Sequence, residues 1–286
     1  MPVVRSASRP TVGERRRAPG GRVCEAFGVD DDLLVPLTGG QGHTWRATDV
    51  VLRPVDDKAE AEWVASVFET LDDVGFRVGR PVAGAAGSFV ENGWTAWTFV
   101  EGRHDFAPHR WDDVLRVGRD FHAAMAHVAF PPFLDRRESP WAEGDRAAWG
   151  EVDLRVDHVD LAPLVERLVD GLRPVNLPRQ VIHGDLGGNV LFADGLPPAV
   201  IDFSPYHRPV EFALAVVVND ALAWYEAPAS IVDALDDVAD LDQLLRRAAI
   251  YRLVTADRLA ADRPAVAASH ARQHRRVAEL VNALAG

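Results

Sequence analysis

The pattern of apolar residues changes near residue 100, and this change restricts the possible folds more than any other feature of the sequence. Up to residue 100, short apolar runs alternate with turn residues, as they do in sheets. Beyond it, apolar positions recur at helical spacing over residues 111–127, 159–172, 210–225, 241–259 and 266–284. The sequence therefore predicts an α+β chain with a sheet-rich part at residues 23–100 and a mainly helical part at residues 101–286.

The sheet-rich part is predicted to contain a three-stranded meander, one helix and further strands. The strands are expected at residues 33–38, 44–47, 50–53, 80–83, 88–90 and 94–100. A glycine-rich turn at residues 39–42 joins the first two strands, and an amphipathic helix is expected at residues 58–71. Together these segments predict a sheet that one helix crosses.

The size and charge of the chain limit its partners. Its 286 residues are 48% hydrophobic, which is enough to bury one large core or two modest ones. The formal net charge of −12 argues against a surface for nucleic acids or anionic membranes and suits cationic ligands. The longest apolar stretch, residues 212–224, is interrupted by Asn219 and Asp220 and is shorter than the roughly 20 residues of a membrane span. We therefore expect no transmembrane segment.

The N-terminal residues and the cysteine content bear on the location of the protein. Residues 1–22 are rich in arginine but contain no apolar core, so they predict a flexible basic tail rather than a secretory signal. Cys24 is the only cysteine, and a single cysteine cannot form an internal disulfide. Both features favour a cytoplasmic protein.

One extended segment interrupts the helical part and carries the clearest chemical motif. It contains the sequence HGDLGGN at residues 183–189, then two short strands around an Asp194-Gly195 turn, then Asp202. The carboxylates of Asp185 and Asp202 and the amide of Asn189 thus flank one hairpin. Such oxygen ligands suit Mg²⁺, which takes its other ligands from water and from substrate phosphates. The motif predicts a metal site that works on a phosphate-bearing cosubstrate.

The order of these features resembles the aminoglycoside phosphotransferase and choline kinase-like family, the small-molecule branch of the protein-kinase-like fold. The resemblance extends over about residues 33–260, and its specific part is residues 183–203. It implies a two-lobed fold, with an N-terminal antiparallel sheet lobe and a mainly helical C-terminal lobe that carries the catalytic hairpin at residues 181–203. It also implies an enzyme that uses ATP and Mg²⁺ to phosphorylate a hydroxyl group of a small molecule.

The resemblance assigns a role to each motif residue. Asp185 would accept the proton of the acceptor hydroxyl or orient that group, and Asn189 and Asp202 would hold the metal. Arg53 would grip the phosphates and pair with Glu62 or Glu60 of the crossing helix. The complete set expected to bind the nucleotide is Gly39, Gly40, Gln41, Gly42, Arg53, Glu62, Val100 and Gly102, and residues 100–102 would form the hinge whose backbone groups meet the adenine. Glu211 would brace the catalytic loop, and His183 is expected to orient that loop rather than to take part in the chemistry.

The sequence departs from the family pattern at three places. Arg53 stands where the family has lysine, and Asp185 and Asn189 are four positions apart where the family has five, so the catalytic loop is shortened. Asp202 is followed by Phe203 and Ser204, without the glycine that is common there.

These departures keep two other functions open. One is an inactive kinase-like module that binds a nucleotide or a partner protein. The other is a metal-dependent hydrolase that uses His183, Asp185 and Asp202 and needs no adenine. For an active kinase, the acidity of the helical part fits a cationic acceptor such as an amino sugar.

Overall fold

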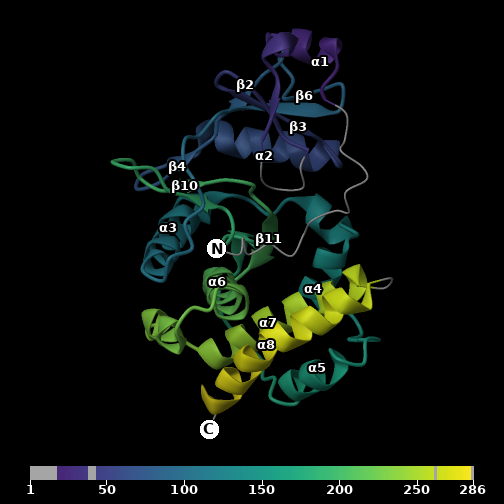
Figure 1. The fold of residues 1–286 in the computed structure, drawn as a ribbon, viewed down its shortest axis with the longest axis vertical. Coiled ribbons are helices and arrows are strands. Elements are labelled where there is room, and N and C mark those ends of the chain that lie inside the picture. Colours follow the sequence, from purple (N-terminus) through teal and green to yellow (C-terminus); the bar gives the residue numbers. More distant parts are fainter. Residues whose placement is uncertain (1–17, 38–42, 261–262, 285–286) are drawn as a thin grey trace. The chain divides into compact units, whose positions relative to one another are not determined.

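The computed structural model describes residues 18–37, 43–260 and 263–284 (Figure 1). Its contacts divide the chain into two compact units. Unit 1 comprises Met1–Arg103 and Leu191–Ile201, and unit 2 comprises His104–Val190 and Asp202–Gly286. The predicted basic tail lies outside the described residues up to position 17, and its last two residues already belong to the short helix α1 (Gly21–Ala26).

Unit 1 contains a six-stranded antiparallel sheet. The strand order is β1-β2-β3-β7-β5, with β6 beside β7. The bounds are β1 (Val35–Pro36), β2 (Trp45–Ala47), β3 (Val50–Pro54), β5 (Pro81–Val82), β6 (Val90–Glu91) and β7 (Trp94–Thr98). The predicted meander is confirmed in β1, β2 and β3, whereas the glycine-rich turn at residues 39–42 lies outside the described residues. Leu52 of β3 and Ala96 of β7 form a buried cluster with Val23, Cys24 and Phe27.

The predicted helix of unit 1 is α2 (Lys58–Thr70). Asp57 caps it by accepting a hydrogen bond from the Glu60 backbone N–H, a common way for a helix to begin. Its buried side chains include Phe68, which meets the Trp97 ring of β7 edge to face at 5.9 Å. Helix α2 is therefore held against the sheet by its apolar face.

A second, three-stranded sheet explains where the hairpin belongs. Its order is β4 (Arg77–Val78), β10 (Ala199–Val200) and β9 (Val190–Leu191), and β10 runs parallel to β4 (Figure 1). The Arg77 side chain also donates to the carbonyl oxygens of Pro197 and Glu101, at 2.7 and 3.0 Å. The pairing of β10 with β4 and the bond to Pro197 link residues 191–201 to unit 1, whereas the sequence pattern assigned the hairpin at residues 181–203 to the helical part.

Unit 2 is mainly helical, as the periodicity predicted. Its helices are α3 (Arg110–Ala124), α4 (Pro140–Ala148), α5 (Ala162–Val169), α6 (Val210–Trp224), α7 (Leu241–Leu259) and α8 (Pro264–Leu284). Short 3₁₀ helices η2 (Met125–His127), η3 (Pro132–Arg136) and η4 (Ala229–Leu235) lie between them, and η1 (Asp31–Leu33) belongs to unit 1. Helix α5 begins three residues later than predicted, because Pro163 is compatible only with a first helical turn.

The core of unit 2 is organised around α6. Twelve of its 15 residues are buried, because α3, α7 and α8 all pack against it. Helices α7 and α8 run side by side (Figure 1). A two-stranded antiparallel sheet, β8 (Gln180–His183) and β11 (Pro205–Arg208), packs against the same helix through β8. No helix among the described residues is both long enough and apolar enough to cross a membrane.

Candidate active site

The HGD motif begins where β8 ends, and its glycine is required by a close packing contact. Gly184 donates its backbone N–H to the Ser204 carbonyl at 2.9 Å, beside β11. A Cβ atom at this position would lie 2.2 Å from the Tyr206 ring. That ring is buried, and its hydroxyl lies 3.2 Å from the Tyr251 hydroxyl. A side chain at position 184 would therefore displace the loop that follows.

His183 holds the backbone of the same loop. Its N–H donates to Nε2 of His122 at 3.0 Å, and its Nδ1 accepts the N–H of Asp185 at 3.2 Å. Burial, together with the neighbouring His183, lowers the pKa of His122 to about 3, so the His122 ring is neutral and can accept this bond. His183 is fully buried, and these contacts give it an orienting role in the loop.

Both carboxylate oxygens of Asp185 have partners. Oδ1 accepts from Arg252 Nη2 at 2.6 Å, and Oδ2 accepts from Asn189 Nδ2 at 3.3 Å. Asn189 Nδ2 also donates to the Asp185 carbonyl, and the Asn189 N–H bonds to the Leu186 carbonyl at 2.9 Å. The side chain of Asp185 remains 49% exposed. The shortened loop therefore still brings Asn189 to Asp185, and Asp185 can still be reached by a ligand.

Asp202 is tied to this loop through the residue that follows it. Asp202 has a φ of 51°, in the left-handed region that aspartate tolerates better than most residues. The next side chain, Phe203, meets the His183 ring edge to face at 5.5 Å and the Phe121 ring at 5.6 Å. Unit 2 thus joins the segments that carry Asp185, Asn189 and Asp202.

Sequence reasoning missed the two buried residues behind Asp185. Arg252 of α7 donates from Nε to Asp220 Oδ1 at 2.9 Å and from Nη2 to Asp220 Oδ2. The side chains of Arg252 and Asp220 are only 6% and 3% exposed. The signal that could have found Asp220 is the polar pair Asn219 and Asp220, which interrupts the apolar run of α6 that follows Glu211.

The described residues among those predicted to bind the nucleotide lie in unit 1. Arg53 is on β3, opposite Thr95 of β7. Glu62 of α2 accepts from the Ser88 hydroxyl at 2.8 Å and from the Val90 N–H at 3.2 Å, so it supports the start of β6. The pairing of Arg53 with a glutamate of α2 stays a prediction, and the predicted Gly39, Gly40, Gln41 and Gly42 lie outside the described residues.

The predicted hinge contains a glycine that the fold requires. Gly102 follows Val100 and Glu101 and has a φ of 151°, which side-chain-bearing residues rarely adopt. A Cβ atom there would lie 2.8 Å from Cβ of Leu191. The next residue, Arg103, exchanges two backbone hydrogen bonds of 2.9 Å with Phe192. The end of β9 therefore fixes the path of the hinge.

A sequence match identifies the family. Residues 34–208, more than half of the chain, match a family model described as the Phosphotransferase enzyme family. The chain belongs to this family. No curated protein sequence matches it.

Solved structures place this phosphotransferase in the protein-kinase-like fold. AMP-bound spectinomycin phosphotransferase APH(9)-Ia is similar with a TM-score of 0.61 at 14% identity, over 91% of this chain and 96% of that chain. The apo form of a thermostable mutant of aminoglycoside phosphotransferase APH(4)-Ia is similar with a TM-score of 0.59 at 17% identity, over 92% of this chain and 98% of that chain. Choline kinase LicA from Streptococcus pneumoniae is similar with a TM-score of 0.58 at 13% identity, over 91% of this chain and 98% of that chain. The expected family, α+β fold and enzyme class are confirmed.

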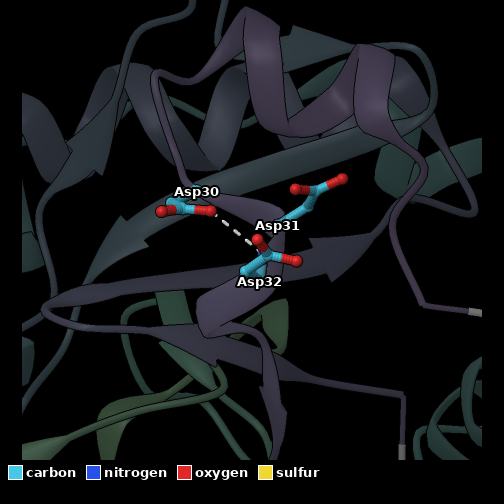
Figure 2. A group of neighbouring side chains, drawn as sticks. All are labelled: Asp30, Asp31 and Asp32. Carbon is cyan, nitrogen blue, oxygen red and sulfur yellow. Dashed lines mark hydrogen bonds between the residues drawn. The ribbon is translucent and has the colours of Figure 1, made fainter.

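The described part of this phosphotransferase also contains an acidic cluster in unit 1. Asp30, Asp31 and Asp32 are exposed neighbours at the start of η1 (Figure 2). Asp30 Oδ1 accepts the N–H of Asp32 at 3.0 Å, which is an ordinary helix cap. Exposed carboxylates in this role need no ion, and we assign no metal to them.

Buried histidines are expected to make the phosphotransferase sensitive to acid. Burial lowers the pKa of His122 and His274 to about 3 and that of His270 to about 4, with Arg252 contributing at His270. The unfolded chain binds protons below about pH 6.5 and the folded chain does not, so stability falls as the pH falls through this window. Lowering the pH from 7 to 5 is expected to reduce the free energy of unfolding by about 2 kcal/mol for each of these histidines.

Urea unfolding of the His270→Phe variant at pH 7 and pH 5 checks this expectation. His270 stacks on His274 and its Nδ1 has no hydrogen-bond partner among the described residues, so phenylalanine keeps the packing without losing a bond. The variant should lose about 2 kcal/mol less than the wild type when the pH is lowered. Equal losses of unfolding free energy in the two proteins would show that His270 does not cause the sensitivity to acid.

Proposed function

We propose that this chain is an ATP- and Mg²⁺-dependent phosphotransferase that acts on a hydroxyl group of a small molecule. The observation that carries the proposal is the geometry of Asp185. Its carboxylate is oriented by Arg252 and Asn189, yet half of the side chain is exposed. A carboxylate held in this way can accept a proton from a bound hydroxyl group.

The transfer itself needs little from the protein beyond positioning. The acceptor oxygen forms a bond to the γ-phosphorus as the bond to the bridging oxygen of ADP breaks, and the hydroxyl proton passes to Asp185. The transition state of such transfers is loose, so rate is gained mainly by holding the two reactants in line. His183 and Gly184 fix the loop backbone for this purpose.

The donor atoms of Asn189 and Asp202 fit Mg²⁺. The Asn189 amide nitrogen is engaged by Asp185, so its Oδ1 atom is the one that would bind the ion. The Asp202 carboxylate follows in the segment that Phe203 ties to the loop. Oxygen donors of these two kinds suit a hard cation. When bound, the ion neutralises charge on the phosphate groups.

Unit 1 supplies the groups proposed to hold ATP. Arg53 would contact phosphate oxygens, and a guanidinium can bind two of them at once. Backbone groups of residues 100–102 would meet the adenine, on a hinge whose path is fixed by Gly102. Structural neighbours that contain AMP or ADP support a nucleotide cosubstrate.

The proposed acceptor is a cationic small molecule in the cytoplasm. The net charge of −12 favours cations, and the buried thiol of the only cysteine, Cys24, fits a reducing compartment. Structures of similar fold are complexes with spectinomycin and with hygromycin B, and one is a choline kinase. Spectinomycin, hygromycin B and choline form a first panel of acceptors.

Acceptor-dependent release of ADP tests the function. The wild type is incubated with ATP and Mg²⁺, alone and with each compound of the panel extended to other amino sugars and amino alcohols. Release of ADP that rises with an acceptor, together with a phosphorylated product, is the expected result. Phosphate release that no acceptor accelerates would indicate a hydrolase, and no turnover with any acceptor would favour the inactive kinase-like module.

A further inference from the structure

Arg252 connects the exposed loop of the site to the buried core of unit 2. Its Nη2 atom donates both to Asp185 Oδ1, at 2.6 Å, and to Asp220 Oδ2. Its Nε atom donates to the other oxygen of Asp220 at 2.9 Å. One guanidinium therefore bridges a loop carboxylate that ligands can reach and a helix carboxylate that they cannot.

The bridge is anchored on the core side by three helices. Arg252 belongs to α7 and Asp220 to α6, and Asn219 Nδ2 donates to Asp220 Oδ1 at 3.0 Å. Asn219 Nδ2 in turn lies 3.4 Å from Nε2 of His274 on α8. The Arg252 guanidinium also lies over the Trp224 ring, 5.3 Å from its centre. These contacts leave Arg252 little freedom to move.

The charges of the group agree with this arrangement. Asp220 and Arg252 are almost completely buried, and burying either charge alone would be strongly unfavourable. Burial raises the pKa of Asp220, and the bidentate contact with Arg252 opposes that rise. Asp220 needs the Arg252 charge, whereas Asp185 is half exposed and is solvated without it.

The contact between Arg252 and Asp185 therefore does more than neutralise a buried charge. Asn189 holds one oxygen of the Asp185 carboxylate from within the loop, and Arg252 holds the other from the core. Two contacts on two oxygens fix the rotation of the carboxylate plane. A catalytic base in this position needs such a fixed direction, because small errors in placement reduce rates strongly.

We propose that Arg252, anchored by Asp220, is a positioning residue that sets the direction of the Asp185 carboxylate toward the acceptor hydroxyl. The inference rests on the proposed function of Asp185. It predicts that loss of Arg252 lowers kcat while the KM values for ATP and acceptor change little, because neither substrate needs to contact Arg252.

The decisive variant removes the buried pair as a whole. In Arg252→Met combined with Asp220→Leu, no charge is left buried without a partner, and apolar replacement of buried ion pairs is often neutral or stabilising. We expect thermal stability near that of the wild type, kcat about 10- to 100-fold lower and KM values within about threefold. A merely structural role would leave kcat unchanged in this folded variant.

A matched control is present in the same unit. Arg208 binds Asp145 through the same bidentate geometry, at 3.0 and 2.6 Å, and both side chains are buried. Neither residue contacts Asp185. The combination Arg208→Met and Asp145→Leu is therefore expected to keep kcat within about twofold of the wild type.

The outcomes separate this inference from the proposed function, with Asp185→Asn as the reference. If Asp185→Asn is inactive but the Arg252 double variant keeps wild-type kcat, the positioning role is overturned and the function stands. If Asp185→Asn keeps wild-type kcat, the proposed function of Asp185 fails instead. If the double variant does not fold, the Arg252→Lys variant is used instead. One ammonium group cannot reproduce the several directed bonds of the guanidinium, so kcat should fall about tenfold. An unchanged kcat in this variant overturns the inference.

Discussion

The Asp185→Asn variant is expected to lose acceptor phosphorylation by a factor of about 10²–10⁴, while its affinity for ATP stays within about threefold of the wild type. The amide has nearly the shape of the carboxylate, but it cannot take the proton of the acceptor hydroxyl. Its oxygen can still accept a hydrogen bond from Arg252, so the loop should keep its conformation. The loss should therefore appear in kcat.

Two measurements on this variant establish the cause of the loss. Product formation is followed with the best acceptor of the panel, and ATP binding is measured separately by calorimetry. Thermal unfolding serves as the control for structure. An equal loss of ATP binding and turnover would contradict a role for Asp185 on the acceptor side.

Replacing Arg208 with alanine is expected to lower the free energy of unfolding by about 3–5 kcal/mol. Arg208 of β11 forms a bidentate pair with Asp145 of α4 and also binds Glu151. Burial raises the pKa of Asp145, and the contact with Arg208 opposes that rise. Without Arg208, Asp145 is a buried carboxylate that has lost both of its hydrogen bonds to a cation, which the folded state tolerates poorly.

Chemical denaturation of three proteins tests this expectation. The single variant Arg208→Ala should show the full loss relative to the wild type. The double variant Arg208→Met and Asp145→Leu should lie within about 2 kcal/mol of the wild type, because the buried charge is removed with its partner. A single variant as stable as the wild type would show that this pair contributes nothing to the fold.

Elements with long periodic patterns were predictable from the sequence. Helix α7 was expected at residues 241–259 and has these bounds, and α2 and α6 each end one residue before the prediction. Hydrophobic spacing determines such helices because each buries one or more faces. Helix α4 was missed because it is only nine residues long, although Ser139 followed by Pro140 is a typical helix start.

The two-residue strand β4 could not be predicted, because a pair of residues carries no periodicity. Without β4, nothing in the sequence indicated that residues 191–201 pair with unit 1 rather than with the helical part that precedes them.

The grouping of candidate site residues was predictable only where one short segment carries them. Asp185 and Asn189 lie within five consecutive residues, so their local motif indicated a shared role, and the structure brings their side chains together. Arg252 is 67 residues from Asp185 and 32 from Asp220. Contacts over such distances depend on how α6 and α7 pack. Sequence periodicity predicts each helix but not which polar residue of one meets a polar residue of the other.

Calorimetric titration of the wild type with ATP, with and without Mg²⁺, tests the central claim most directly, since it needs no knowledge of the acceptor. We expect binding in the micromolar range that depends on Mg²⁺. In the Asp202→Ala variant, this dependence on the metal should disappear. Absence of ATP binding by the wild type, both with and without Mg²⁺, would contradict the assignment of this chain as an ATP-dependent phosphotransferase.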